Sequence, residues 1–281
     1  MSVASRVSEP VLQAGSSEAS GWDCHVHVFD AAAAVRPGHY VPTHRPLSEI
    51  EQVAQRSGIG HLVLVQPSVY GTDNSVMLHA LEAARGRHRG VAVVDATMGD
   101  DELDRLHAAG VRGVRFNRVS PAGHGSDVAS DLLRLAPRLR DRGWHVQWYV
   151  SAGDLSRLVS WQAETGLCFV LDHLAGLDAS LAVSHPTWGD AKALADAGSW
   201  IKLSGWYRLG ATEPYAALLP NIRRAAALFG PRTVWGSDWP HTSFAADRMP
   251  TYESTWAPVV ATLGDERLDA LLHAQPRALY F

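Results

Sequence analysis

The stretch "DCHVHVFD", residues 23–30, places two histidines one residue apart in an otherwise apolar segment. An extended strand turns alternate side chains to opposite faces. This period predicts that His25 and His27 point into one pocket, while Cys24, Val26 and Val28 point the other way. An isolated pair of this kind can also be two ordinary histidines hydrogen-bonded at a strand end. The rest of the chain has to decide between a structural and a functional role.

Seven more segments rich in Val, Ile and aromatic residues follow this first one. Several are continuous apolar runs, which are typical of strands covered on both faces of a sheet. Together with residues 22–29 they predict eight strands. The seven are "HLVLVQPS" (61–68), "GVAVVDAT" (90–97), "VRGVRFN" (111–117), "WHVQWYV" (144–150), "CFVLDHLAG" (168–176), "WIKLSG" (200–205) and "TVWGSDWP" (233–240).

Helical patterns lie between these strands, and each stops at a glycine. A glycine just past a helix accepts the left-handed conformation that closes it. The predicted helices span 47–57, 74–85, 101–109, 127–142, 154–165, 189–197 and 216–229, and they precede Gly58, Gly86, Gly110, Gly143, Gly166, Gly198 and Gly230.

Eight alternations of strand and helix within 281 residues predict a single-domain α/β fold, the (β/α)8 TIM barrel. We expect the barrel to span residues 21–281, after a flexible N-terminal lead at residues 1–20. A doubly wound open sheet is the alternative. It is less well supported, because the first turn carries no glycine-rich phosphate-binding fingerprint.

Composition limits the partners that this protein can have. A net charge of -4 gives no basic surface for nucleic acid or for an anionic membrane, and no run of 18 apolar residues predicts a membrane span. Two cysteines, Cys24 and Cys168, make no disulfide framework and fit a cytoplasmic protein. We therefore expect a small-molecule ligand, and the oligomeric state cannot be read from the sequence.

Polar residues gather at the carboxyl ends of the predicted strands, where barrel enzymes carry their catalytic groups. Taken singly, each has a structural explanation: His173 as a core histidine, Asp238 as a cap, Gln66 as a partner of loop backbone, Lys202 as structural or solvated. The combination of His25, His27, His173 and Asp238 at one barrel mouth can instead hold a metal ion or polarise a carbonyl. The full set is His25, His27, Gln66, Ser68, Arg115, Asn117, Gln147, Tyr149, Asp172, His173, Lys202, Ser204 and Asp238.

The chain resembles the amidohydrolase superfamily, whose members carry His-x-His after the first strand, here His25 and His27, and an aspartate after the eighth, here Asp238. More narrowly, four motifs in this order resemble its branch of 2-pyrone-4,6-dicarboxylate hydrolases and sugar-acid lactonases: "VLVQPSVYGTDN" (63–74), "GVRGVRFN" (110–117), "VLDHLAG" (170–176) and "WGSDWPH" (235–241). The resemblance runs from Trp22 to the C-terminal "QPRALYF". It implies that His25, His27, His173 and Asp238 are catalytic.

The chain departs from many members of that superfamily in its metal ligands. Its fourth strand lacks the lysine that bridges two metals, and its fifth strand has Gln147 and Tyr149 where many relatives have a histidine. These departures argue against a two-metal site. We expect either no required cofactor or a single Zn²⁺ held by His25, His27 and Asp238.

The resemblance also implies the substrate-binding residues. Arg115 is expected to meet a substrate carboxylate, because a guanidinium fork matches that group. A second arginine of the pyrone hydrolases falls near Pro121 here, and Arg118 or Arg208 could take its place. The remaining candidates are Tyr40, Gln66, Ser68, Tyr149 and Arg208.

The sequence therefore predicts a lactonase of aromatic catabolism. It would open a carboxylated lactone that is 2-pyrone-dicarboxylate-like, muconolactone-like or a sugar-acid lactone. Asp238 would activate water while the histidines polarise the carbonyl. A metal-dependent decarboxylase of the same superfamily is the alternative, and a non-catalytic binding barrel is a third possibility. Both are less well supported, the first because a metal ligand is missing and the second because the histidine and aspartate set is complete.

Overall fold

The computed structural model describes residues 19–37, 40–123, 127–182, 184–242, 244–245 and 248–281. Its eight strands form one parallel sheet in sequence order. The outer strands approach each other through a parallel bridge between Val26 and Trp239. The strands are β1 Gly21–Val26, β2 Ile59–Val65, β3 Arg89–Ala92, β4 Val111–Asn117, β5 His145–Tyr149, β6 Phe169–Leu171, β7 Trp200–Leu203 and β8 Thr233–Trp235.

Two backbone hydrogen bonds bring β1 against the segment that follows β8. The amide of His27 donates to the carbonyl of Trp239 at 2.9 Å, and the amide of Asp238 donates to the carbonyl of His25 at 2.8 Å. The sheet is therefore a nearly closed barrel, and the predicted (β/α)8 fold is confirmed.

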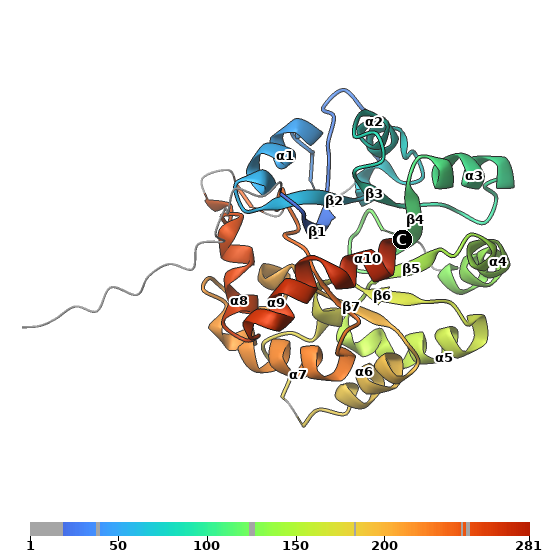
Figure 1. Ribbon diagram of the computed structural model, residues 1–281. Helices are drawn as coiled ribbons and strands as arrows, with labels where there is room; N and C mark the ends of the chain where they lie inside the picture. The colour runs from blue at the N-terminus through green and yellow to red at the C-terminus, as the bar shows by residue number, and fades with distance from the viewer. Residues whose placement is uncertain (1–18, 38–39, 124–126, 183, 243, 246–247) are drawn as a thin grey trace, which may run out of the picture.

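Helices surround the strands in Figure 1, and they alternate with them along the chain as predicted. The predicted flexible lead falls mostly on residues 1–18, which lie outside the described residues. The sequence did not predict the three C-terminal helices. The α-helices are α1 Leu47–Gln55, α2 Ser75–Ala83, α3 Asp100–Ala108, α4 Val128–Asp141, α5 Leu155–Thr165, α6 Thr187–Asp196, α7 Leu219–Phe229, α8 Ala257–Val260, α9 Asp265–Leu272 and α10 Ala274–Tyr280.

The barrel interior is a small apolar cluster, separate from the larger core under the helices. Tyr280 of α10 belongs to it, which places α10 across one end of the barrel, as Figure 1 shows. This helix covers the end opposite the loops that carry the polar residues. The cluster consists of Trp22, Cys24, Val63, Val65, Val91, Val170, Trp200, Val234 and Tyr280.

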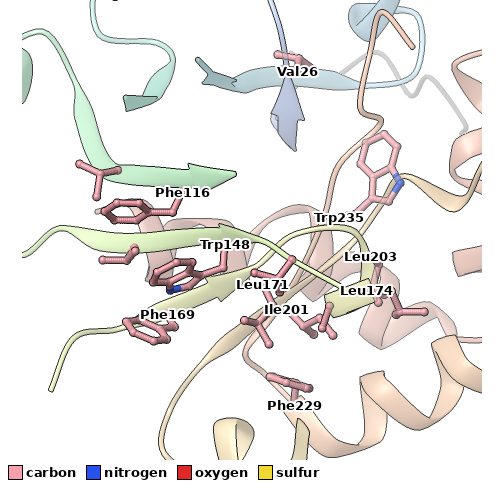
Figure 2. Close-up of a cluster of buried hydrophobic side chains, with 14 of the residues drawn as sticks. Val26, Phe116, Trp148, Phe169, Leu171, Leu174, Ile201, Leu203, Phe229 and Trp235 are labelled. Carbon is pink, nitrogen blue, oxygen red and sulfur yellow. The ribbon is translucent and has the colours of Figure 1, made fainter. Parts of the chain in front are cut away.

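The larger core lies between the outer face of the strands and the helices. Figure 2 shows Phe116, Trp148 and Phe169, which come from β4, β5 and β6 and pack in one layer. The ring centroids of Phe116 and Trp148 lie 4.9 Å apart, and Trp148 also stacks on Trp161 of α5 at 5.4 Å. This layer packs against the outer face of β4, β5 and β6, and the ends of these strands carry part of the candidate site. None of the helices in the described part of the chain is both long and apolar enough for a membrane span.

One detail of the predicted alternation is wrong. Cys24 does not point away from His25: it packs in the interior cluster, whereas Val26 packs in the outer core. The pairing of β1 with β2 shifts register between Asp23 and Val26. Such an irregularity allows two successive side chains to face the same way, so both Cys24 and His25 face inward.

All seven glycines predicted to close helices have positive φ, between 56° and 105°. Gly143 follows α4 with φ of 64°, and a methyl group there would meet no atom within 4 Å. Gly189 lies inside α6, and the space around it is equally open. The two positions therefore differ in backbone conformation and not in packing.

We expect alanine to have opposite effects at these two glycines. Gly143→Ala should lower the free energy of unfolding by about 1 kcal/mol, because an L-residue is strained at positive φ. Gly189→Ala should raise it by roughly 0.5–1 kcal/mol, because alanine favours a helix interior. Urea denaturation of both variants measures the two shifts. Shifts of the same sign would contradict this account of the helix ends.

Candidate functional site

One carboxylate oxygen, Oδ1 of Asp238, lies at the centre of the predicted catalytic set. Nε2 of His27 is 3.4 Å from it, Nε2 of His25 is 3.6 Å from it, and Nε2 of His173 is 3.9 Å from it. All four residues are buried. The structure thus brings together residues from the ends of β1, β6 and β8, as the barrel topology predicts.

The backbone around this set is unusual, and two glycines make room for the imidazoles. Asp238 and His173 have φ values of 63° and 47°, in the left-handed region that costs a non-glycine residue energy. A Cβ on Gly236 would lie 2.5 Å from Cβ of His25, and one on Gly205 would lie 2.4 Å from Nδ1 of His173. Glycine is therefore required in both "LSG" and "WGSD".

The second oxygen of Asp238 is held by two donors. Oδ2 accepts from the hydroxyl of Tyr207 at 2.6 Å and from Nε of Arg208 at 2.7 Å. Burial alone would raise the pKa of Asp238, but the guanidinium of Arg208 and the neighbouring imidazoles hold it well below its usual value. Asp238 is an anchored, ionised carboxylate whose Oδ1 remains directed at the histidines.

Asp172 is a second buried carboxylate, and the sequence reasoning gave it no role. Its Oδ2 accepts from Nε of Arg115 and from Nε2 of Gln147, both at 3.0 Å. Its Oδ1 lies 3.2 Å from Nδ1 of His25 and 3.5 Å from Nζ of Lys202. Lys202 is fully buried and paired, so the idea that it is solvated is wrong.

These contacts change the expectation for Arg115. The guanidinium does not need a substrate anion for charge compensation, because Asp172 already supplies an anion at Nε. Burial would raise the pKa of Asp172, yet the nearby His25, Lys202 and Arg115 hold it well below its usual value. Arg115 can still bind a ligand because it also lines the cavity described below.

Hydrogen bonds fix which nitrogens of the first two histidines face the centre. Nδ1 of His27 lies 2.7 Å from the carbonyl oxygen of Val65, so a neutral ring donates from Nδ1 and keeps a lone pair on Nε2. Burial lowers the pKa of His25 well below its usual value. Nδ1 of His25 lies 3.2 Å from Oδ1 of Asp172, and a proton on this nitrogen would leave a lone pair on Nε2. Nε2 of both rings and Oδ1 of Asp238 would then each present a lone pair to the centre of the site.

This donor set fits one metal ion. The ligand atoms of His25, His27 and Asp238 lie within 4.8 Å of one another. Nε2 of His25 and Oδ1 of Asp238 are buried with no hydrogen-bond partner among the described residues. Three protein ligands suit a catalytic zinc, which keeps a further position open. A second set, His25, Asp172 and His173, shares His25 with the first, and its carboxylate is already paired with cations.

A cavity of about 150 Å³ opens beside this centre. Seven of the candidate residues named from the sequence line it, and Arg208 does so while paired with Asp238. Gln66 does not line it: its amide donates to the carbonyls of Gly71 and Asp73, which is the structural role that the sequence left open. The lining residues are His27, Tyr40, Pro67, Ser68, Arg115, Asn117, Val119, Ser120, Pro121, Tyr149, Arg208 and Thr242.

For two residues of the site that received no role, the position in the sequence already indicated that they face the barrel interior. Asp172 and Gln147 end predicted strands, on the face that turns inward, and both were noted there without a role. Tyr207 lies in a short 3-10 helix after β7, and Thr242 lies in the loop after β8, where no periodicity indicates the direction of a side chain. Arg118 does not line the cavity, because it lies beside Asp154 and Trp161.

The model of the Amidohydrolase family matches residues 22–281 of this chain. The chain belongs to the amidohydrolase family. A 2-pyrone-4,6-dicarboxylate hydrolase from Comamonas testosteroni is 32% identical over 248 residues, which cover 81% of this chain and 79% of that protein. A 4-sulfomuconolactone hydrolase from Rhizobium radiobacter is 31% identical over 237 residues, 82% of this chain and 79% of that protein.

A solved structure supports the same assignment. A Pseudomonas putida protein assigned to the 2-pyrone-4,6-dicarboxylic acid hydrolases superposes on this amidohydrolase with a TM-score of 0.82 at 30% identity, covering 93% of this chain and 97% of that one. The resemblance seen in the sequence is therefore confirmed. The protein is a hydrolase, and its relatives include hydrolases named for lactones.

Two buried histidines of this amidohydrolase have strongly lowered pKa values. Burial lowers the pKa of His173 to about 4, which leaves its ring neutral at pH 7. Burial and the charge of Lys202 lower the pKa of His145, at the start of β5, to about 3. In the unfolded chain both rings take up a proton near pH 6.5. As pH falls from 6.5, the unfolded state gains protons that the folded state does not bind, so stability decreases.

We expect His145→Gln to weaken this acid dependence. Between pH 7 and pH 4.5 the wild-type protein should lose about 2–3 kcal/mol more stability than the variant, because only the wild-type unfolded state gains that proton. Urea unfolding at several pH values measures the difference. His79→Gln, which replaces an exposed histidine on α2, is the matched control. Parallel pH curves for wild type and His145→Gln would contradict the assignment.

Proposed function

We propose that this amidohydrolase opens a carboxylated lactone by hydrolysis. The observation that carries the proposal is Oδ1 of Asp238: it is buried, lies among three imidazoles and has no hydrogen-bond partner in the described residues. His27 and Arg208, which both contact Asp238, line the adjacent cavity. A water held at this oxygen would lie beside the ligand.

In the proposed reaction, Oδ1 of Asp238 removes a proton from this water as its oxygen attacks the lactone carbonyl carbon. The ring C–O bond then breaks, and the proton passes from Asp238 to the departing alkoxide. The products are a carboxylic acid and an alcohol within one molecule. Asp238 suits this role because it is ionised at neutral pH, although its lowered pKa makes it a weak base that relies on exact placement.

His173 is the best-placed neutral donor for the oxyanion that forms. Its Nδ1 lies 3.0 Å from the hydroxyl of Ser204, which can donate to it and leave the proton on Nε2. An aimed donor of this kind contributes about 3 kcal/mol to a transition state. His25 and His27 would polarise the carbonyl as donors only with a second proton on the ring, since in the neutral form proposed here each presents a lone pair.

The same two histidines, with Asp238, would hold a single Zn²⁺ where one binds, and that ion would supply Lewis-acid polarisation of the carbonyl. The proposal covers both cases, no required cofactor and one zinc. It does not include a second metal, because β4 and β5 offer Arg115 and Gln147 where a two-metal site would need a lysine and a histidine.

Arg115 and Arg208 are the proposed contacts for the substrate carboxylate. Both line the cavity, and both flank the ring of Tyr149, at 5.4 Å and 5.8 Å from its centroid. The names of the relatives give anionic lactones, a dicarboxylate and a sulfonate. A relative from Acinetobacter baumannii, 28% identical with a TM-score of 0.79, was solved with citric acid bound.

We also propose a cytoplasmic location. The two cysteines are both free thiols, which fits the location that the sequence suggests.

A panel of lactones assayed with a pH indicator and a CO2 sensor tests the reaction. We expect proton release without CO2 on a carboxylated lactone. Asp238→Asn should lower kcat by about 10²-fold or more, because it removes the proton acceptor while keeping the shape. CO2 release would support the decarboxylase instead. A variant that keeps its melting temperature and a rate within about threefold of wild type would rule out Asp238 as the base.

Replacing Arg115 separates ligand recognition from support of the barrel. Arg115→Met should raise KM for a carboxylated lactone by about 10- to 100-fold, the equivalent of 1.5–3 kcal/mol of charged hydrogen bonding, and should affect a neutral lactone far less. Loss of the partner of Asp172 should lower kcat on both. Arg118→Met is the matched control outside the cavity. Equal changes in KM on the two lactones would show that Arg115 does not bind the carboxylate.

Chelation tests the need for a metal. We expect the hydrolase to keep most of its activity after dialysis against a strong chelator, because Lys202, Arg115 and Arg208 already compensate the buried carboxylates. Metal analysis by plasma mass spectrometry should accompany the assay to show that the sample is metal-free. Activity that disappears with the metal and returns with one equivalent of zinc would show that His25, His27 and Asp238 need the ion.

A further inference from the structure

The carboxylate of Asp172 contacts two parts of the site, the histidine set around Asp238 and an arginine that lines the cavity. One oxygen faces the ring of His25, at 3.2 Å, and the other accepts from Nε of Arg115, at 3.0 Å. His25 belongs to the set around Asp238, and Arg115 lines the ligand cavity. Asp172 itself is fully buried and is not among the residues that line the cavity.

Lys202 determines how the groups around Asp172 are oriented. Its ammonium donates to Oε1 of Gln147 at 2.6 Å and to the carbonyl of Cys24 at 2.9 Å. Because a lysine can only donate, the atom of Gln147 that faces it must be the amide oxygen. The amide nitrogen of Gln147 is then the atom that meets Oδ2 of Asp172, at 3.0 Å.

Two donors therefore converge on Oδ2 of Asp172, and both carry protons of their own. Oδ2 has to be an unprotonated acceptor, and the charges of Lys202 and Arg115 favour an ionised carboxylate. Oδ1 then lies 3.2 Å from Nδ1 of His25, and neither of these two buried atoms has another hydrogen-bond partner among the described residues. The favourable arrangement for a neutral ring places the proton on Nδ1, which leaves the lone pair on Nε2.

We propose that Asp172 is a positioning residue that fixes His25 in the Nδ1-protonated tautomer, so that Nε2 presents a lone pair to Oδ1 of Asp238 and to whatever binds between them. Carboxylates that orient an imidazole in this way are common behind catalytic and metal-binding histidines. His27 has the same tautomer through the carbonyl of Val65. Both histidines of the His-x-His pair then present the same kind of atom to the site.

The wild-type protein alone tests the tautomer. A ¹⁵N spectrum of the metal-free enzyme, labelled at histidine, distinguishes an N–H nitrogen from an unprotonated one, and the spectrum of His25→Gln identifies the signals of this ring. We expect a protonated Nδ1 and an unprotonated Nε2 at pH 7. A proton on Nε2 would overturn the proposal without any assay of activity.

Asp172→Asn tests the cause. Oδ2 faces two donors, so the amide oxygen of asparagine should take its place and turn the amide nitrogen toward His25. The ring must then accept at Nδ1, and the proton should move to Nε2. Asp23→Asn is the matched control: Asp23 is also buried and accepts from the backbone amide of His25 at 3.0 Å, but it does not contact the ring.

The tautomer should move in Asp172→Asn and stay unchanged in Asp23→Asn. An Asp172→Asn variant that keeps the proton on Nδ1, or an Asp23→Asn variant that also moves it, would overturn the proposal. If Asp172→Asn does not fold, the wild-type spectrum still decides.

The kinetic consequence rests on the proposed lactone hydrolysis. Loss of a carboxylate that fixes a catalytic tautomer lowers kcat by up to about 10⁴-fold in other hydrolases. We expect kcat of Asp172→Asn to fall by about 10²-fold or more, while KM for a carboxylated lactone stays within about threefold, since Arg115 keeps an acceptor. A larger change in KM than in kcat would contradict a positioning role. If no lactone is hydrolysed by wild type, the proposed function fails, and the ¹⁵N spectra still test the tautomer.

Discussion

The site depends on the compensation of two buried carboxylates, Asp172 and Asp238. Taking an unpaired carboxylate out of water costs several kcal/mol, so each must be paired where the fold buries it. Asp172 is paired with Arg115 and Lys202, and Asp238 with Arg208. Each acid uses one oxygen for a short contact with its arginine and turns the other toward the histidines. The two arginines therefore compensate the buried carboxylates and also line the cavity.

The fold supplies this arrangement through backbone features that are costly elsewhere. β1 shifts register so that Cys24 and His25 both face inward, and Asp238 has a left-handed φ of 63°. Gly236 lies so close to His25 that a Cβ at position 236 would clash with it. Local strain of this kind persists only where the surrounding structure imposes it. Here that structure is the nearly closed barrel and the aromatic layer behind β4, β5 and β6.

The sequence predicts the barrel and the four central residues because both follow from local patterns. Strands have period two, helices stop at glycine, and catalytic residues follow strands, so His25, His27, His173 and Asp238 could be placed at one mouth. The ion pairs and hydrogen bonds that hold these residues in place could not be predicted in this way. Arg115 and Asp172 are 57 residues apart, and Lys202 and Cys24 are 178 apart. No local period reports such contacts. The register shift in β1 is also invisible, because it depends on the pairing with β2 and not on residues 23–26 alone.

Charge balance links these pairs to the choice of substrate. The interconnected group contains three cations, Arg115, Lys202 and Arg208, and two carboxylates, Asp172 and Asp238, while burial keeps His25 and His173 neutral. One substrate carboxylate would neutralise the remaining positive charge. A second carboxylate would need a further cation, and Pro121 stands where the pyrone hydrolases are expected to have an arginine. For the lactone hydrolysis proposed here, and with no metal ion or protonated histidine to supply that charge, a lactone with one carboxylate would match the site better than a dicarboxylate.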